Sequence, residues 1–174
     1  MNRFSRMNTF PALNQTVLTA SPEHSRLSRW AAAQGAVLLK NEDNILPIKK
    51  GRAVSLFGRA CIDYQKGGQG SGEVWSYHVS TLFEAFTEKL REGKVNLLTY
   101  PAHYYGHKVI LEPQLVHHKY LTDEPEIQEF MIDDVVNADG VAIIMIGRTS
   151  TEGRDRTAEK GDFYLTDAEK ALVD

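Results

Sequence analysis

The stretch "RAVSLFG", residues 52–58, decides the fold class of this chain. It is a short apolar run, rich in residues that favour β-structure, and it ends in a glycine, which is typical of a buried parallel strand. Two similar runs follow, "VNLLTY" at residues 95–100 and "VAIIMIG" at residues 141–147. We expect these three segments to be strands of one sheet.

Helical patterns separate the expected strands. Thr81 and Glu84 have the spacing of a capping box, and the helix that they begin is predicted to end at Gly93. Residues 101–121 show no clear pattern and are predicted to be irregular. A further helix is predicted after the cap residue Thr122, and its buried stripe consists of Ile127, Phe130, Met131 and Val135.

Two more helices are predicted near the ends of the chain. Ser21 is a good N-cap and Pro22 suits the first helical position, so a helix is predicted over residues 22–34. Thr166, with Glu169 three residues later, begins another helix, and the chain stops within it.

The alternation of strands and helices predicts an open, mostly parallel sheet with helices on both faces, an α/β/α sandwich. Because no strand follows the last helix, we expect a truncated sandwich that is part of a larger protein. Residues 1–20 are predicted to be an N-terminal arm, and residues 21–174 the partial sandwich domain. Ligands of such sheets bind beyond the carboxyl ends of the strands, so the loops at residues 59–79 and 148–161 are expected to face one side.

Composition argues against several classes of function. The 174 residues suffice for one domain with a core, and the net charge of −3 argues against a nucleic-acid partner. No apolar run approaches the roughly 18 residues of a membrane span, and no secretory signal is recognisable. Cys61 is the only cysteine, which excludes an internal disulfide and fits a reducing compartment. A cytoplasmic location is therefore expected.

The glycine-rich stretch "GGQGSG", residues 67–72, is a candidate for ligand contact. Backbone amides in such a loop can approach a phosphate or a sugar closely, but a plain flexible turn has the same composition. No Gly-Lys-Ser/Thr follows, as a P-loop requires, and Glu73 stands where the third glycine of a dinucleotide fingerprint would be. The residues alone leave both interpretations open.

Four histidines are candidate metal ligands, because two of them lie four residues apart, as on one face of a helix. They are His103, His107, His117 and His118. Pro101 and the aromatic neighbours argue against a helix there, and no acidic partner has ligand spacing. We therefore interpret residues 101–121 as a surface insertion and expect no metal site.

The charged stretch "GRTSTEGRDR", residues 147–156, contains the candidate catalytic group, Glu152. Glu152 lies five residues past the end of an expected strand, on the same rim as the glycine loop. The neighbouring arginines favour its ionised form, whereas an apolar or sugar-filled pocket would raise its pKa toward general-acid work. A solvated ion pair is the alternative interpretation.

Three stretches together resemble glycoside hydrolase family 3, the β-glucosidases and related exo-acting enzymes. The stretch "AAAQGAVLLKNEDNILPI" (31–48) is similar to the family's helix and "LLKN…LPL" segment. The stretch "VSLFGRACIDYQKGGQGSGEV" (54–74) is similar to its first strand and glycine loop. The stretch "GRTSTEGRDRTAEKGDFYLTDAEKALV" (147–173) is similar to its "R-x-SGEG-x-DR…Y-L…E…L" signature. The resemblance covers roughly residues 25–174, with 101–121 unmatched.

The resemblance implies a retaining β-glycosidase with two domains. A TIM-like barrel carries an aspartate nucleophile, and an α/β sandwich supplies the acid/base glutamate. The glutamate of the signature falls on Glu152, with Thr151 in place of a glycine, and Ser71 matches a position that contacts the sugar in the first subsite. Gln69 is a further substrate-binding candidate, and Trp75 is either a sugar platform or an aromatic that packs the loop onto the sheet.

The nucleophile half of such an enzyme is not recognisable in this chain. No "SDW"-like motif occurs, and the sandwich motifs begin near the N-terminus. The resemblance therefore implies a member with reversed domain order whose barrel is absent here, so the chain alone is expected to be inactive. The expected partners are a β-linked glucoside or oligosaccharide and the missing barrel; homo-oligomer formation is left open.

The resemblance implies no metal and no organic cofactor. In the charged loop, it makes the remaining charged residues a frame around the glutamate: Arg148, Arg154, Asp155 and Arg156. Two other functions are kept as alternatives. One is a non-catalytic carbohydrate-binding domain, and the other is an α/β domain that binds a nucleotide or phosphate at the glycine loop.

Overall fold

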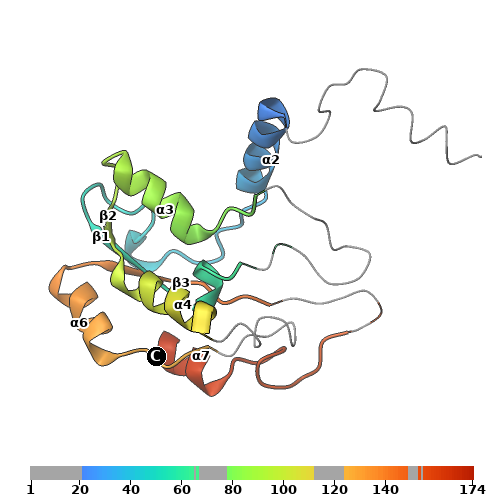
Figure 1. Cartoon of the computed structure of the whole chain (residues 1–174), viewed down its shortest axis with the longest axis vertical. Coiled ribbons are helices and arrows are strands. Elements are labelled where there is room, and N and C mark those ends of the chain that lie inside the picture. Colours follow the sequence, from blue (N-terminus) through green and yellow to red (C-terminus); the bar gives the residue numbers. More distant parts are fainter. Residues whose placement is uncertain (1–20, 65, 67–77, 112–123, 149–152, 154) are drawn as a thin grey trace, which may run out of the picture. The chain divides into compact units, whose positions relative to one another are not determined.

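A computed structural model describes the chain in several stretches, namely residues 21–64, 66, 78–111, 124–148, 153 and 155–174 (Figure 1). The chain divides into two compact units, Met1–Ile45 and Leu46–Asp174. Each unit is described by itself.

The described part of the first unit contains helix α2 (Pro22–Gln34) and the short 3-10 helix η2 (Glu42–Asn44). The Ser21 side chain caps α2, because its Oγ accepts a hydrogen bond from the backbone N–H of His24 at 3.2 Å. The prediction for this helix is confirmed, including both of its ends.

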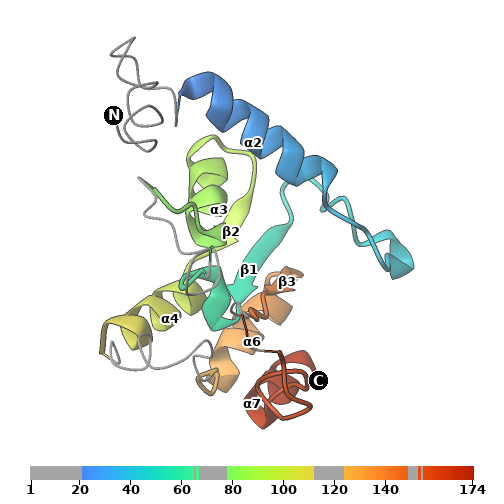
Figure 2. The ribbon, with the colours of Figure 1, turned by 90° about the vertical axis from the view of Figure 1, so that its right-hand side faces the viewer.

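The second unit holds the sheet. Its elements, in chain order, are β1 (Ala53–Phe57), the 3-10 helix η3 (Arg59–Cys61), α3 (Leu82–Arg91), β2 (Asn96–Leu98), α4 (Tyr100–Leu111), α6 (Glu129–Asn137), β3 (Val141–Ile144) and α7 (Asp167–Val173). The strand order is β2-β1-β3, and β1 pairs in parallel with both neighbours (Figures 1 and 2). The predicted open parallel sheet is confirmed.

Helices cover both faces of this sheet, as predicted. Side chains of β1 alternate between the faces, so Val54 and Leu56 point to one side and Phe57 to the other. The first side packs against α3 through Leu82, Phe83 and Phe86, and the second packs against α6 through Met131 and Val135. Figure 1 shows α3 on one side of the strands and α6 and α7 on the other. The capping boxes predicted for α3 and α7 are both present.

The strand order places a topological switch point between β1 and β3. From β1 the chain crosses to β2 on one side, and it then returns past β1 to β3 on the other. Gly58, with φ 89°, ends β1 so close to β3 that an added Cβ would lie 2.2 Å from the carbonyl oxygen of Met145. The two loops that follow β1 and β3 therefore begin side by side, where open α/β sheets bind ligands.

The prediction that residues 101–121 are irregular is wrong for their first half, because α4 occupies Tyr100–Leu111. Pro101 lies in the first turn of this helix, where its missing N–H has no intrahelical acceptor to lose. Pro101, Ala102 and Tyr105 are buried, so packing stabilises this helix. Residues 112–121 lie outside the described residues.

The helix predicted after Thr122 begins later than expected, at Glu129. Residues 124–128 are not helical; Pro125 disfavours helical backbone at Glu124, and the Glu124 carboxylate bonds to a distant backbone amide. In the predicted stripe, Met131 and Val135 are buried, Ile127 packs from outside the helix, and Phe130 is 43 % exposed. Thr122 itself lies outside the described residues.

Candidate functional site

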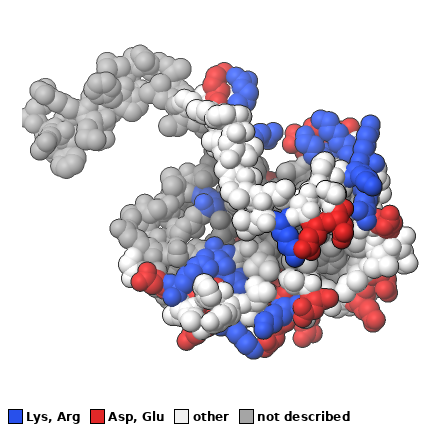
Figure 3. Space-filling view, turned by 180° about the vertical axis from the view of Figure 1, so that it is seen from behind, with Lys and Arg blue, Asp and Glu red and all other residues white. Residues whose placement is uncertain are grey.

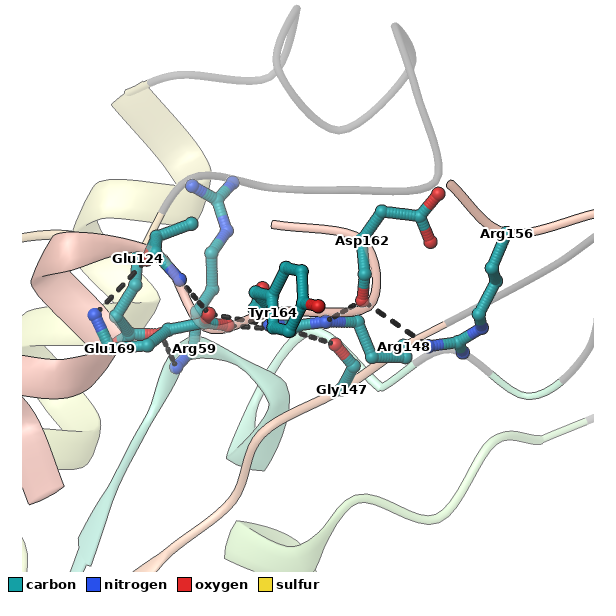
Figure 4. A network of polar contacts seen from close by, with 9 residues as sticks. Arg59, Glu124, Gly147, Arg148, Arg156, Asp162, Tyr164 and Glu169 are labelled. Carbon is teal, nitrogen blue, oxygen red and sulfur yellow. Dashed lines mark hydrogen bonds and ion pairs between the residues drawn. The ribbon is translucent and has the colours of Figure 1, made fainter. Parts of the chain in front are cut away.

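The candidate site lies at the carboxyl ends of β1 and β3, where two arginines begin the two loops. Arg59 follows Gly58 after β1, and Arg148 follows Gly147 after β3. Each arginine is held by a carboxylate from a distant part of the second unit, and Figure 4 shows the polar contacts of both.

Arg148 forms a two-point ion pair with Glu169 of α7. Its Nη1 and Nη2 each donate to one carboxylate oxygen of Glu169, and both distances are 2.6 Å. The side chains are only 14 % and 9 % exposed. Parallel bonds of this kind are charge-assisted and fix the orientation of both groups. The pair therefore ties the loop after β3 firmly to the start of α7.

The same guanidinium also binds backbone carbonyls on both sides of the loop. Nη1 donates to the carbonyl oxygen of Gly147 at 2.8 Å, Nε donates to that of Asp162 at 2.8 Å, and Nη2 donates to that of Tyr164 at 3.4 Å. Gly147 lies before the loop, whereas Asp162 and Tyr164 lie after it. One side chain thus contacts the backbone on both sides of segment 149–161.

Charge and burial act together on this pair. Hydrogen bonding to Glu169 raises the pKa of Arg148 above its ordinary value, although burial opposes this. Burial disfavours the charged form of Glu169, but the bonds from Arg148 and from the Thr166 amide outweigh it and lower the pKa of Glu169. Both groups are therefore held in their charged forms.

The returning half of the loop continues into a compact turn that ends at Tyr164. The Asp162 carboxylate accepts bonds from the backbone N–H and the hydroxyl of Thr157, at 2.6 and 2.9 Å. The Gly161 N–H donates to the Tyr164 carbonyl oxygen at 2.7 Å, and Gly161 has a φ of 84°. An exposed ion pair of 2.6 Å between Lys160 and Asp167 adds a second link to α7.

A second buried cluster surrounds Arg59. The Arg59 side chain is 2 % exposed, and its Nε lies 3.5 Å from the Asp63 carboxylate. Its backbone N–H donates to Glu124 Oε2 at 2.9 Å, which links the stretch before α6 to the end of β1. Tyr105 of α4 is fully buried nearby. The cluster fixes the start of the loop that leads to the glycine-rich stretch.

The groups in this second cluster have shifted pKa values. Burial raises the pKa of Glu124, the nearby Glu169 charge raises it further, and the bond from the Arg59 amide opposes the shift. Burial, together with the Glu124 charge, also raises the pKa of Tyr105, and it raises that of Cys61 to about 12. Cys61 is therefore a protonated core thiol at neutral pH.

Sequence reasoning did not single out Glu124, Tyr105 or Glu169 as parts of a site. Glu169 was recognised only as the third residue of a capping box, a role that the structure confirms. Glu124 is one of several acids in its stretch, and its bond to Arg59 spans 65 positions of sequence. The one signal in the sequence was the position of Arg59 directly after an expected buried strand, because an arginine that is buried there needs carboxylate neighbours.

The predicted site residues themselves lie outside the described residues: Glu152, Ser71, Gln69 and Trp75. The structure describes the anchors of both loops, namely Gly58 to Tyr64 after β1 and Gly147, Arg148 and 155–164 around the charged loop. Of the expected charged frame, Arg148 is bound as described, Arg156 donates to the Asp162 carbonyl oxygen at 3.4 Å, and Asp155 is exposed.

The histidines lie differently from the prediction. His103 and His107 are on α4, so the statement that no helix forms there was wrong, but both are exposed. The His103 ring packs edge-on against Phe83, with ring centroids 5.8 Å apart. Among the described residues, no group of three or more His, Cys, Asp or Glu could hold a metal ion. His117 and His118 lie outside the described stretches.

The described surface shows mixed charge. Figure 3 shows basic and acidic side chains interspersed on one face, without a continuous basic patch there. This distribution agrees with the net charge of −3. In the part of the chain that the structure describes, no helix combines the length and apolarity needed to cross a bilayer.

Comparisons with known proteins point to one family. The chain is 34 % identical to β-glucosidase A of Butyrivibrio fibrisolvens, over 99 % of this chain and 24 % of that protein. It is 31 % identical to a β-glucosidase of Ruminococcus albus, over 81 % of this chain and 15 % of that protein. The chain thus spans less than a quarter of the length of these curated relatives.

Solved structures agree with the sequence comparisons. A β-glucosidase from Paenibacillus barengoltzii matches 85 % of this chain and 16 % of its own, with a TM-score of 0.75 and 30 % identity. β-Glucosidase 3B from Thermotoga neapolitana, in complex with α-D-glucose, matches 94 % of this chain and 23 % of its own, with a TM-score of 0.73 and 30 % identity. The description "Glycosyl hydrolase family 3 C-terminal domain" matches residues 36–174. Because this match covers most of the chain, the chain belongs to glycosyl hydrolase family 3, and residues 36–174 match its C-terminal domain.

Proposed function

We propose that this chain supplies the acid/base glutamate and part of the sugar-binding site of a retaining, exo-acting β-glycosidase. The observation that carries the proposal is the close approach of Gly58 and Met145 at the switch point. It brings together the starts of the two loops whose sequences resemble the family's sugar-binding and acid/base loops. The names of the relatives, all β-glucosidases, support a terminal β-linked glucose as the sugar that is removed.

In the proposed reaction, Glu152 acts twice. It first donates its proton to the glycosidic oxygen while an aspartate of the missing domain attacks the anomeric carbon, so the bond to the leaving group breaks and a glycosyl–enzyme ester forms. The ionised Glu152 then takes a proton from water, which attacks the same carbon and releases the aspartate. Two displacements at one carbon retain the configuration. Ser71, Gln69 and Trp75 are proposed to bind the sugar.

The rest of such an enzyme must come from outside this chain. A retaining mechanism needs two carboxyl groups about 5–5.5 Å apart, and we propose that a TIM-like barrel of the same protein carries the second. The chain alone is then inactive. A cytoplasmic location belongs to the same proposal and is supported by the single, buried Cys61.

The replacement Glu152→Gln in the full-length protein tests this function. Alkyl β-glucosides have poor leaving groups, so their kcat/KM should fall by roughly 10²–10⁴-fold when the acid is removed. Dinitrophenolate is a good leaving group that needs no protonation, so kcat/KM for dinitrophenyl β-glucoside should stay nearly unchanged. The second step should be slow without the general base, and azide should restore kcat because it attacks the glycosyl–enzyme in place of the activated water. Glu88→Gln, at an exposed position of α3, is the matched control.

Two outcomes would contradict the proposal. Wild-type rates on alkyl glucosides in the Glu152→Gln variant would remove Glu152 from the acid/base role. A full-length protein that binds glucose in calorimetry but hydrolyses no aryl β-glycoside would instead be a carbohydrate-binding protein.

A further inference from the structure

The loop that contains Glu152 in the sequence has a built anchor, and this anchor is the Arg148–Glu169 pair. We infer that Arg148 and Glu169 are positioning residues for the acid/base loop, and this inference rests on the function proposed above. Neither side chain offers a free charge to a substrate, because the guanidinium of Arg148 and the carboxylate of Glu169 are paired with each other. Their effect on the reaction would pass through the loop.

The contacts of Arg148 show how one residue can set the loop. Its guanidinium carries five N–H donors in a fixed plane. Its three nitrogens donate to backbone carbonyl oxygens on both sides of segment 149–161. The Gly147 oxygen lies before the segment, and the Asp162 and Tyr164 oxygens lie after it. The remaining contacts go to Glu169. A lysine has one nitrogen and cannot hold all these groups in one geometry.

Glu169 connects this anchor to the rest of the second unit. Its Oε2 also accepts the Thr166 N–H at 2.8 Å, and its own N–H donates to Thr166 Oγ1 at 3.1 Å, which completes the capping box of α7. Leu172, one turn further along α7, packs against the cluster of Phe57, Met131 and Val135. Through Glu169 and α7, Arg148 is thus connected to the side chains that pack on the sheet.

A second link between the charged loop and α7 offers a comparison. Lys160 and Asp167 form an ion pair of 2.6 Å, but their side chains are 61 % and 80 % exposed. Exposed pairs of this kind contribute little, because water and salt screen them. The buried pair links the start of the charged loop to α7 and the exposed pair links its returning half to α7, but the two should differ in their effect on catalysis.

The positions of the contacts predict which chemical step depends on them. Segment 149–161 contains Glu152, and a displacement of about 1 Å of a reacting group can cost roughly 10²-fold in rate. Loosening the base of the loop should therefore weaken proton donation to the leaving group. Steps that need no proton donor should be affected much less.

The test uses Arg148→Lys and Glu169→Gln in the full-length protein, with alkyl and dinitrophenyl β-glucosides as probes. Arg148→Lys keeps the charge but not the fork of donors. Glu169→Gln keeps one acceptor oxygen and turns an amide N–H₂ toward Arg148 or Thr166. In both variants we expect kcat/KM for the alkyl glucoside to fall roughly tenfold to a hundredfold. For the dinitrophenyl glucoside it should change less than about threefold, and Asp167→Asn should change neither.

The outcomes separate this inference from the proposed function. Glu152→Gln, measured in parallel, shows whether Glu152 acts as the general acid. If Glu152→Gln gives the leaving-group-dependent loss but Arg148→Lys and Glu169→Gln leave both substrates unchanged, the positioning role is wrong while the function stands. Equal losses on both substrates, accompanied by lowered thermal unfolding temperatures, would also overturn it, because they indicate a merely structural pair.

Discussion

At the scale of single residues, Gly58 determines how closely β1 and β3 approach at their carboxyl ends. Its φ of 89° is in the region that favours glycine, and an added Cβ would lie 2.2 Å from the Met145 carbonyl oxygen. The Met145 N–H donates to the Phe57 carbonyl oxygen at 2.9 Å, so the obstructing backbone is held in place by the sheet. No other residue type fits this position without moving a strand.

Replacing Gly58 by alanine should therefore destabilise the chain strongly. The positive φ costs about 1 kcal/mol for a residue with a Cβ, and the clash with backbone adds roughly 1–3 kcal/mol as overpacking does. Gly93→Ala is the control, since Gly93 has a φ of 67° but nothing within 4 Å of an added Cβ. Urea unfolding of the purified variants measures both. Equal losses of unfolding free energy at the two positions would contradict the close contact.

At the scale of elements, helix α4 is part of the core and not a surface insertion. Tyr105 is fully buried in one cluster with Val54 and Leu56 of the central strand β1 and Leu97 of its neighbour β2. Tyr105→Ala should lower the free energy of unfolding by about 3–5 kcal/mol, as aromatic truncations in cores do. His107→Ala, at an exposed position of the same helix, should change it by less than about 0.5 kcal/mol. Similar small effects for both would show that α4 does not pack on the sheet.

The elements that sequence alone predicted are those whose signals are local. The three strands are apolar runs, and α2, α3 and α7 begin with Ser21, Thr81 and Thr166 as caps, which the structure confirms. The start of α6 was missed because its N-cap residue, Gln128, makes no side-chain cap bond. Helix α4 was missed because Pro101 was taken as a helix breaker, although the first turn tolerates it.

The same distinction applies to the candidate site. Residue types and spacing single out the charged loop, because polarity after an apolar strand is visible in the sequence. The partner of Arg148 is 21 positions away and that of the Arg59 amide is 65 positions away, so neither contact can be read from local patterns. Such pairings depend on the strand order, which brings the ends of β1 and β3 together.

At the scale of the whole second unit, two glutamates of the polar region have pKa values that are shifted in opposite directions. Bonds from Arg148 and Thr166 lower the pKa of Glu169 despite its burial, whereas burial and the Glu169 charge raise that of Glu124. A lowered pKa gives stability that is present above the ordinary value of 4.5 and is lost as pH falls. A raised pKa gives stability that is fully present below 4.5 and is lost as pH rises through the folded-state value.

The two glutamine variants should therefore show opposite slopes of relative stability against pH. As pH rises above about 4.5 and through the raised pKa of Glu124, Glu124→Gln should gain stability relative to the parent chain, because the parent increasingly carries a buried charge that glutamine lacks. From about pH 3 to about pH 7, Glu169→Gln should lose stability relative to the parent, because the parent gains the ionised partner of Arg148. Urea unfolding at several pH values measures both differences, and each variant serves as the control for the other. Slopes of the same sign would contradict the opposite shifts of the two pKa values.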